Sequence, residues 1–118
     1  MKNLYRRLTE HGVNTDEVIN RLGKNENLYL SICLKFLSDQ SYPLFQKALK
    51  AGDLSEARMQ IHTLKGVAAN LGFVYLNALC KHILAILDQN DYPHLEQDLK
   101  SLSQEYHILI AILSEGIT

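Results

Sequence analysis

The sequence has almost no excess charge of either sign. Its 118 residues carry 12 basic and 13 acidic side chains, which gives a formal net charge of -1. Proteins that bind nucleic acids or membrane surfaces generally carry a basic patch, so we expect neither as a partner. Hydrophobic residues make up 47% of the chain and charged residues 21%, the balance of one globular domain with its own core.

The chain also lacks long hydrophobic runs and any cysteine motif. No apolar run is long enough to span a bilayer, and the first residues do not resemble a secretory signal. Cys33 and Cys80 lie inside apolar helical patterns, without a Cys-x-x-Cys pair or a cluster of His and Cys. We expect buried, reduced thiols rather than a disulfide or a reactive thiol. These absences predict a soluble, cytoplasmic protein without direct membrane insertion.

Valine is scarce where leucine is abundant, with four valines against 21 leucines. Unbranched and γ-branched side chains lose less rotamer freedom in a helix than β-branched ones do. No alternation of apolar and polar residues is long enough to indicate a strand. The sequence therefore predicts an all-α protein.

Cap residues and apolar spacing divide the chain into helices. Two short segments end at Gly12 and Gly23, and four longer ones cover about 25–52 (interrupted at Pro43), 54–71, 74–88 and the region that begins at Asp91 and Pro93. Four amphipathic helices with short links predict an antiparallel four-helix bundle. We expect one domain over residues 1–118, with a helical lid at about 1–24 and the bundle at about 25–116.

The segment 28–37 is apolar on almost every side, because eight of its ten residues are apolar. Three of these, Leu28, Ile32 and Leu34, border its narrow polar stripe. Either the helix lies deep in the bundle, or this edge docks against a partner.

The segment 54–71 carries the most informative pattern. At 100° per residue its apolar side chains gather on one face, which is the expected core face, made by Ala57, Ile61, Leu64, Val67, Ala68 and Leu71. His62 lies in the middle of the opposite face. Gly66 and Ala69 leave the surface beside it bare, and Arg58 and Lys65 place positive charge near the imidazole.

A lone exposed histidine is usually an ordinary surface residue, and a glycine inside a helix often reflects close helix packing. Gly66, however, lies opposite the core face, so packing within the bundle does not explain it. An exposed imidazole with a bare approach and adjacent cations favours a site for a large anionic group. Phosphoryl transfer has these requirements, because it depends mainly on positioning and charge stabilisation.

The same residues resemble the signature of histidine-containing phosphotransfer (HPt) domains of two-component phosphorelays. The central motif consists of His62, Leu64, Lys65, Gly66, Ala69, Leu71 and Gly72. The likeness extends over about residues 18–90.

The resemblance implies that His62 accepts a phosphoryl group, by family habit on Nε2, from a phospho-aspartate of a receiver domain and passes it to a second receiver. Lys65 would steady the phosphoryl oxygens, and Gly66 would let the receiver approach closely. Partner contacts are expected at Arg58, Gly66 and Ala69 and at the edge formed by 28, 32 and 34.

We further expect no cofactor or metal of the chain's own, since Mg²⁺ would come with the receiver. No nucleotide-binding glycine pattern is present, so we expect a phosphotransfer intermediate without ATP-dependent kinase activity, and we expect a monomer. The chain would be either free-standing or the C-terminal module of a hybrid sensor kinase.

One position departs from the family pattern. Many HPt domains have a polar side chain, often glutamine, 22 residues after the histidine, and here that residue is Leu84. Thr63, Asn70 and His82 are all candidates to replace the missing contact, and the sequence does not rank them.

Two other functions compete with a phosphorelay carrier. A helical adaptor would bind a signalling partner through the same apolar edge without accepting phosphate, and it would have no need of His62. A metal or haem bundle would need inward-facing ligands on several helices, and the helical phases give none.

Overall fold

The structure is a computed structural model that describes residues 2–90 and 92–117. These residues form α1 (Lys2–Glu10), α2 (Thr15–Arg21), α3 (Glu26–Ser38), α4 (Ser41–Lys50), α5 (Leu54–Leu71), α6 (Val74–Gln89), a 3-10 turn η1 (Tyr92–His94) and α7 (Leu95–Ile117). They contain no strand. The all-α class predicted from the leucine bias is therefore confirmed.

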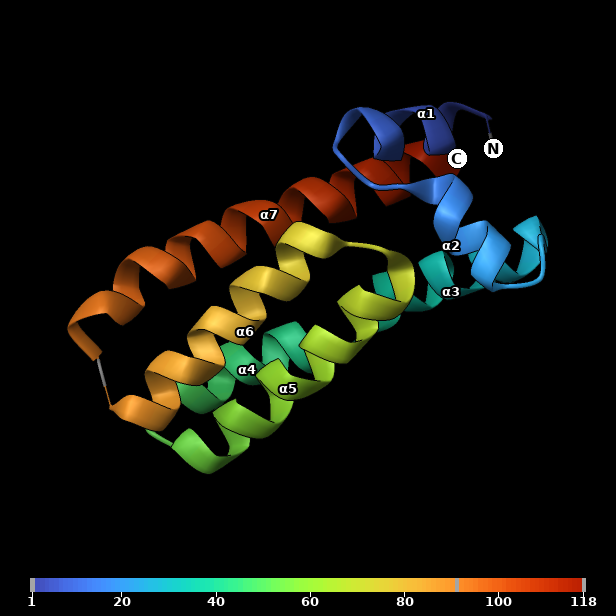
Figure 1. Cartoon of the computed structure of the whole chain (residues 1–118). Helices are drawn as coiled ribbons and strands as arrows, with labels where there is room; N and C mark the ends of the chain where they lie inside the picture. The colour runs from blue at the N-terminus through green and yellow to red at the C-terminus, as the bar shows by residue number, and fades with distance from the viewer. Residues whose placement is uncertain (1, 91, 118) are drawn as a thin grey trace.

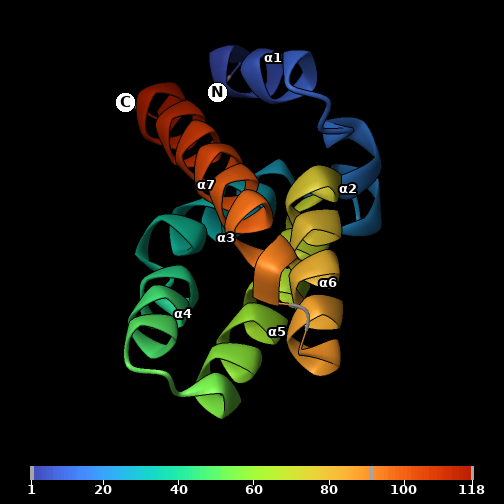
Figure 2. The same ribbon diagram turned by 90° about the vertical axis from the view of Figure 1, so that its left-hand side faces the viewer.

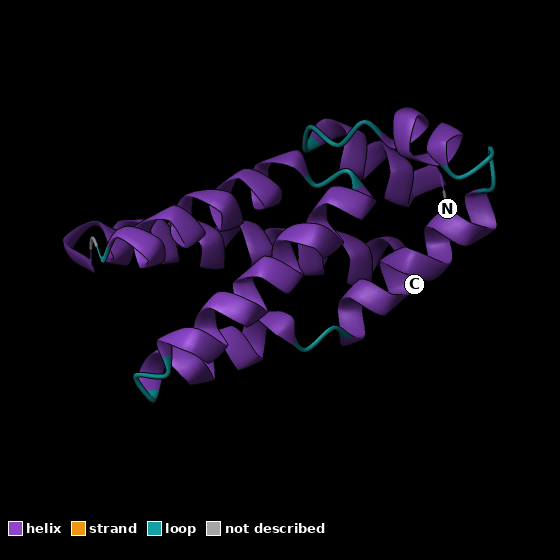
Figure 3. Cartoon of the chain, turned by 60° about the horizontal axis from the view of Figure 1, so that its bottom comes forward, coloured by secondary structure: helices purple, strands orange, loops and turns teal. Residues whose placement is uncertain are grey.

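Helices α4, α5, α6 and α7 form an antiparallel four-helix bundle, and α3 extends the α4 side of it (Figure 1). Figure 2 looks along the bundle and shows these four helices around a common interior. Only short loops separate the helices (Figure 3). The interior is filled by fully buried side chains that include Phe45, Ile61, Leu64, Leu76, Ile83, Leu87 and Leu109. None of the described helices is long and apolar enough to cross a membrane.

The first bundle helix is divided in two, and the division lies before Pro43 rather than at it. Helix α3 ends at Ser38 and α4 begins at Ser41. The Asp39 carboxylate accepts hydrogen bonds from the backbone N–H of Ser41, at 2.9 Å, and from the Ser41 hydroxyl. Pro43 lies in the first turn of α4, where the missing N–H breaks no intrahelical bond. The predicted interruption is thus the start of a new helix, α4, and the Asp39 carboxylate bonds its first N–H.

The last helix begins later than predicted. Asp91 lies outside the described residues, and Pro93 belongs to the 3-10 turn η1. Helix α7 starts at Leu95. The turn uses the fixed φ of proline, which suits a 3-10 conformation as well as a first α-helical turn.

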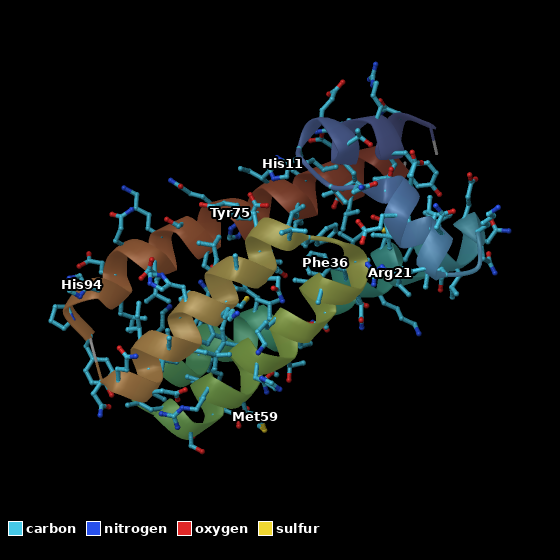
Figure 4. All side chains as sticks on the ribbon, in the orientation of Figure 1. His11, Arg21, Phe36, Met59, Tyr75 and His94 are labelled. Carbon is cyan, nitrogen blue, oxygen red and sulfur yellow. The ribbon has the colours of Figure 1, made fainter. Side chains whose placement is uncertain are left out.

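Helices α1 and α2 pack against the bundle as the predicted N-terminal lid. Leu4 and Leu8 of α1 are fully buried. Arg7 Nη1 lies 2.7 Å from Glu115 Oε2 of α7, and His11 lies between α1 and α7 (Figure 4). Its Nε2 is 2.9 Å from both carboxylate oxygens of Glu105, a residue only 5% exposed. The lid therefore covers α7, whereas its boundary at residue 24 stays a prediction.

Both cysteines are buried free thiols, as predicted. Burial raises the pKa of Cys33 and of Cys80 to about 12. Neither thiol is therefore ionised near neutral pH, and both act as small apolar core residues.

Helix α5 has the predicted bounds because both ends are capped by side chain or backbone. At its start, the Asp53 carboxylate accepts a hydrogen bond from the Glu56 N–H at 3.1 Å. At its end, Gly72 has a left-handed φ of 78°, a conformation that glycine adopts without strain. The chain then turns directly into α6, so α5 and α6 pack antiparallel.

Gly72 also lies against Val18 of α2. This contact gives a test of the fold. A Cβ at Gly72 would lie 2.4 Å from Cγ2 of Val18, whereas a Cβ at Gly52, which has a similar φ of 73°, would meet nothing within 4 Å. Gly52→Ala should lower the free energy of unfolding by about 1 kcal/mol through backbone strain alone. Gly72→Ala should lower it further, because Val18 must also move. Urea unfolding of both variants measures the difference, and equal losses would contradict the packing of α2 on the end of α5.

Candidate functional site

His62 occupies the middle of α5, on the face opposite the core. Ile61 and Leu64, its neighbours on the buried face, are fully inaccessible, whereas the His62 side chain is exposed. Within the part of the chain that the structure describes, its imidazole has no hydrogen-bond partner, so neither ring nitrogen is engaged by these residues. This is the placement predicted from the helical phase.

The surface beside His62 is bare toward the C-terminal end of α5. Gly66 and Ala69, one and two turns further along, are both exposed. A Cβ built at Gly66 would meet nothing within 4 Å. Neither backbone conformation nor close packing within the chain therefore requires this glycine, although it weakens a helix interior by about 1 kcal/mol relative to alanine.

On the other side of His62, a shallow groove runs between α5 and α6. Helix α5 contributes Ser55, Arg58, Met59, His62 and Lys65 to it, and α6 contributes Lys81, Leu84, Ala85 and Asp88. Figure 4 shows Met59 on the outer side of α5, directed away from the other helices, and its side chain is 55% exposed. His62 is thus reached from open solvent rather than through an enclosed pocket.

The two cations predicted beside His62, Arg58 and Lys65, differ in whether a carboxylate pairs with them. Arg58 Nε lies 2.7 Å from the Asp88 carboxylate of α6, and its Nη2 lies 3.5 Å from the carbonyl oxygen of Leu87. The Asp88 charge therefore offsets the charge that Arg58 brings to the groove. Lys65 has no such carboxylate partner among the described residues, and it lies half-buried beside the groove.

The side chain of Asn77 fixes α6 against the site. Its Nδ2 donates a hydrogen bond to the Lys65 carbonyl oxygen at 2.9 Å. This bond and the contact between Arg58 and Asp88 set the register of α5 and α6 on the two sides of His62. Nothing in the sequence pattern indicated Asn77, because a contact across two helices depends on their register.

Leu84, the residue that departs from the family pattern, does line the groove with His62, but it offers no polar group. The three proposed substitutes do not line it. Thr63 donates its hydroxyl to the Met59 carbonyl at 3.1 Å, His82 Nδ1 lies 3.2 Å from Asp98 of α7, and Asn70 is exposed near the end of α5. The polar α6 residues on the groove are instead Asp88, which pairs with Arg58, and Lys81, and the sequence pattern indicated neither.

The apolar edge of α3 lies away from the groove. Leu28 is 41% and Leu34 45% exposed, and Ile32 is partly buried, so α3 is not enclosed by the bundle. The hydroxyl of Tyr29 donates to the Leu71 carbonyl at 3.2 Å. This contact places α3 beside the end of α5, about 13 Å along the helix from His62.

The described residues do not contain a group of three or more His, Cys, Asp or Glu side chains placed to hold a metal ion. In the groove itself the lining carboxylate is Asp88, and Arg58 already neutralises it.

Comparison with known proteins identifies a family and a similar fold. The family model described as the Hpt domain matches residues 37–112, the segment that contains His62, Lys65 and Gly66. The chain is similar in fold to the crystal structure of histidine-containing phosphotransfer protein B (HptB) from Pseudomonas aeruginosa PAO1. The TM-score is 0.76 and the sequence identity 20%, over 88% of this chain and 92% of that chain. A search of the curated proteins finds no significant match.

The family match covers more than half of the chain, and the fold agrees with it over most of the length. The family match does not favour the alternative function, a helical adaptor that binds a partner without accepting phosphate. The chain belongs to the family of histidine-containing phosphotransfer domains, and its function is that of a phosphorelay carrier.

Proposed function

We propose that His62 is the residue that carries the phosphoryl group. It would accept the group on Nε2 from the phospho-aspartate of one receiver domain and pass it to the aspartate of another. The observation that carries this proposal is the combination of an unpartnered imidazole in the middle of α5 with a bare surface at Gly66 and Ala69.

The transfer needs little from this chain beyond an accessible nucleophile. The lone pair of the ring nitrogen attacks phosphorus, the N–P bond forms, and the bond from phosphorus to the aspartyl oxygen breaks, leaving a carboxylate on the donor. Onward transfer reverses these roles with a second aspartate. Both partners must approach in line with the bond that breaks, and the open surface on α5 leaves room for this approach.

We propose that Lys65 stabilises the phosphoryl oxygens on His62. Backbone N–H groups in the middle of an α-helix are already bonded to carbonyls one turn earlier, so they cannot hold the phosphate. Side chains must supply the compensating charge. Lys65 lines the same groove as His62 and has no carboxylate partner among the described residues.

The Mg²⁺ that phosphoryl transfer requires would come with the receiver domain. In support, the Asp88 carboxylate in the groove is held by Arg58 and so is a poor metal ligand. We further propose that the chain is an intermediate without ATP-dependent kinase activity of its own. The family's role as a carrier supports this.

We propose that the receiver docks over Gly66 and Ala69, with Arg58 at one margin of the contact. The exposed edge of α3, formed by 28, 32 and 34, would meet the receiver at its periphery. We also expect the chain to act as a monomer in the cytoplasm, either free-standing or as the C-terminal module of a hybrid sensor kinase.

The proposal predicts that phosphoryl uptake depends on one of the five histidines. With a phosphorylated receiver and Mg²⁺, His62→Gln should lose uptake by at least about a hundredfold, because no other side chain replaces the nucleophile. His82→Gln is the matched control, since His82 is also exposed on the neighbouring helix. Acid-labile, base-stable label is the readout. Labelling of His62→Gln at the wild-type level would refute the proposal, and binding of receivers without any labelling of the wild type would favour the adaptor.

A second prediction separates docking from chemistry at Gly66. Gly66→Ala should raise the free energy of unfolding by about 1 kcal/mol, because the added Cβ meets nothing and alanine favours the helix. Transfer from a receiver should nevertheless slow, and Gly66→Leu should slow it more. Phosphoramidate is a small phosphoryl donor that needs no docking surface. It should label the wild type and both variants at similar rates. Unchanged transfer from the receiver to Gly66→Leu would show that this glycine does not serve docking.

A further inference from the structure

Lys81 lies across the groove from His62. On α5, His62 lies between Arg58 and Lys65, and on α6 their respective partners are Asp88 and Asn77, at 2.7 Å and 2.9 Å. The helices are antiparallel, so the α6 residues between these two contacts face the α5 residues between them. Lys81 is in that interval, and it lines the groove with His62.

Among the cations of the groove, Lys81 is free to bind a new anion. It is exposed, and the structure places no carboxylate against it within the described residues. Arg58, by contrast, is engaged by Asp88. The groove therefore has one available ammonium group on the α5 side, from Lys65, and one on the α6 side, from Lys81.

Leu84 is the apolar neighbour of Lys81 on the α6 side of the groove. It lies one helical turn after Lys81 on the same groove wall, and its side chain donates no hydrogen bond. Any contact from α6 to a phosphoryl group on His62 must therefore come from another side chain. Lys81 has three N–H donors on a flexible stem that can reach over the groove.

We infer that Lys81 is a positioning residue that binds the phosphoryl group of phosphorylated His62 from the α6 side, opposite Lys65. The inference rests on the proposed function of His62. Lys81 forms no covalent bond and keeps its proton, and it donates hydrogen bonds to the phosphoryl oxygens. It thereby supplies the polar contact that Leu84 cannot make.

The inference predicts a change in how the bound phosphoryl group titrates. The wild-type chain, labelled with phosphoramidate, is titrated and followed by ³¹P NMR. The charged groups that face His62 in the groove are Arg58 and Lys65 from α5 and Lys81 and Asp88 from α6. A nearby cation favours the dianionic phosphoryl group, so Lys81→Ala should raise the midpoint of its last ionisation. Lys81→Arg should restore the wild-type midpoint.

Transfer from a phosphorylated receiver gives a second readout. Lys81→Ala should slow it about tenfold, the effect of losing one charge-assisted hydrogen bond. Lys65→Ala serves as the positive comparison. Lys100→Ala is the matched control, because Lys100 is an exposed lysine of α7 that does not line the groove. It should change neither the midpoint nor the rate.

The outcomes separate this inference from the proposal about His62. If the wild type is labelled and Lys81→Ala behaves like Lys100→Ala in both measurements, Lys81 has no role and the function of His62 stands. If neither phosphoramidate nor a receiver labels the wild type, both proposals fail. Thermal melting of each variant checks that the fold is intact, which the exposure of Lys81 leads us to expect.

Discussion

The antiparallel packing of α5 against α6 is the constraint on which the rest of the site depends. Small buried side chains on α5, Ala57 and Ala68, let neighbouring helices come close, and polar contacts at Asn77 and Asp88 fix the register. The helical phase of α5 directs His62 outward, and this register places Lys81 opposite it on the groove. The core and the functional face are thus two sides of the same helix, and neither can shift without the other.

This arrangement suits a carrier more than a catalyst. An enzyme usually encloses its reacting groups and excludes water, whereas His62 lies on an open helix face with no hydrogen-bond partner among the described residues. The rigid helix fixes the position of the imidazole, and the partner must bring the remaining catalytic groups. An open face also serves two partners in turn, because neither has to displace a lid. The N-terminal lid does not cover His62, because Arg7 of α1 and His11 after it contact α7 and no residue of α1 or α2 lines the groove.

The bounds of α5 and the outward direction of His62 could be predicted from sequence because both are local. Asp53 and Gly72 cap the helix, and the 3.6-residue period decides which side faces the core. The break was placed near Pro43, although α3 ends at Ser38 and the Asp39 side chain bonds the first N–H of α4. A proline tolerated in a first turn does not itself mark the boundary.

The contacts between helices could not be predicted in this way. Arg58 was expected to add positive charge beside His62, but its pairing with Asp88 depends on the α5–α6 register. For the same reason Lys81 was missed, even though it lies one turn before Leu84, the position where the family pattern is broken. The helical phase of α6 puts Lys81 on the face that carries Leu84, which makes it a candidate. That Lys81 faces His62 depends on the α5–α6 register, which the helical phase does not give.

The most direct test of the central claim is to find which nitrogen of the chain bears phosphorus. The ¹⁵N-labelled wild type, phosphorylated by a receiver domain, can be examined by ³¹P–¹⁵N correlation NMR. We predict a single phosphohistidine with its N–P bond at Nε2 of His62. Phosphorus on any of the other four histidines, or on no histidine at all, would contradict the account.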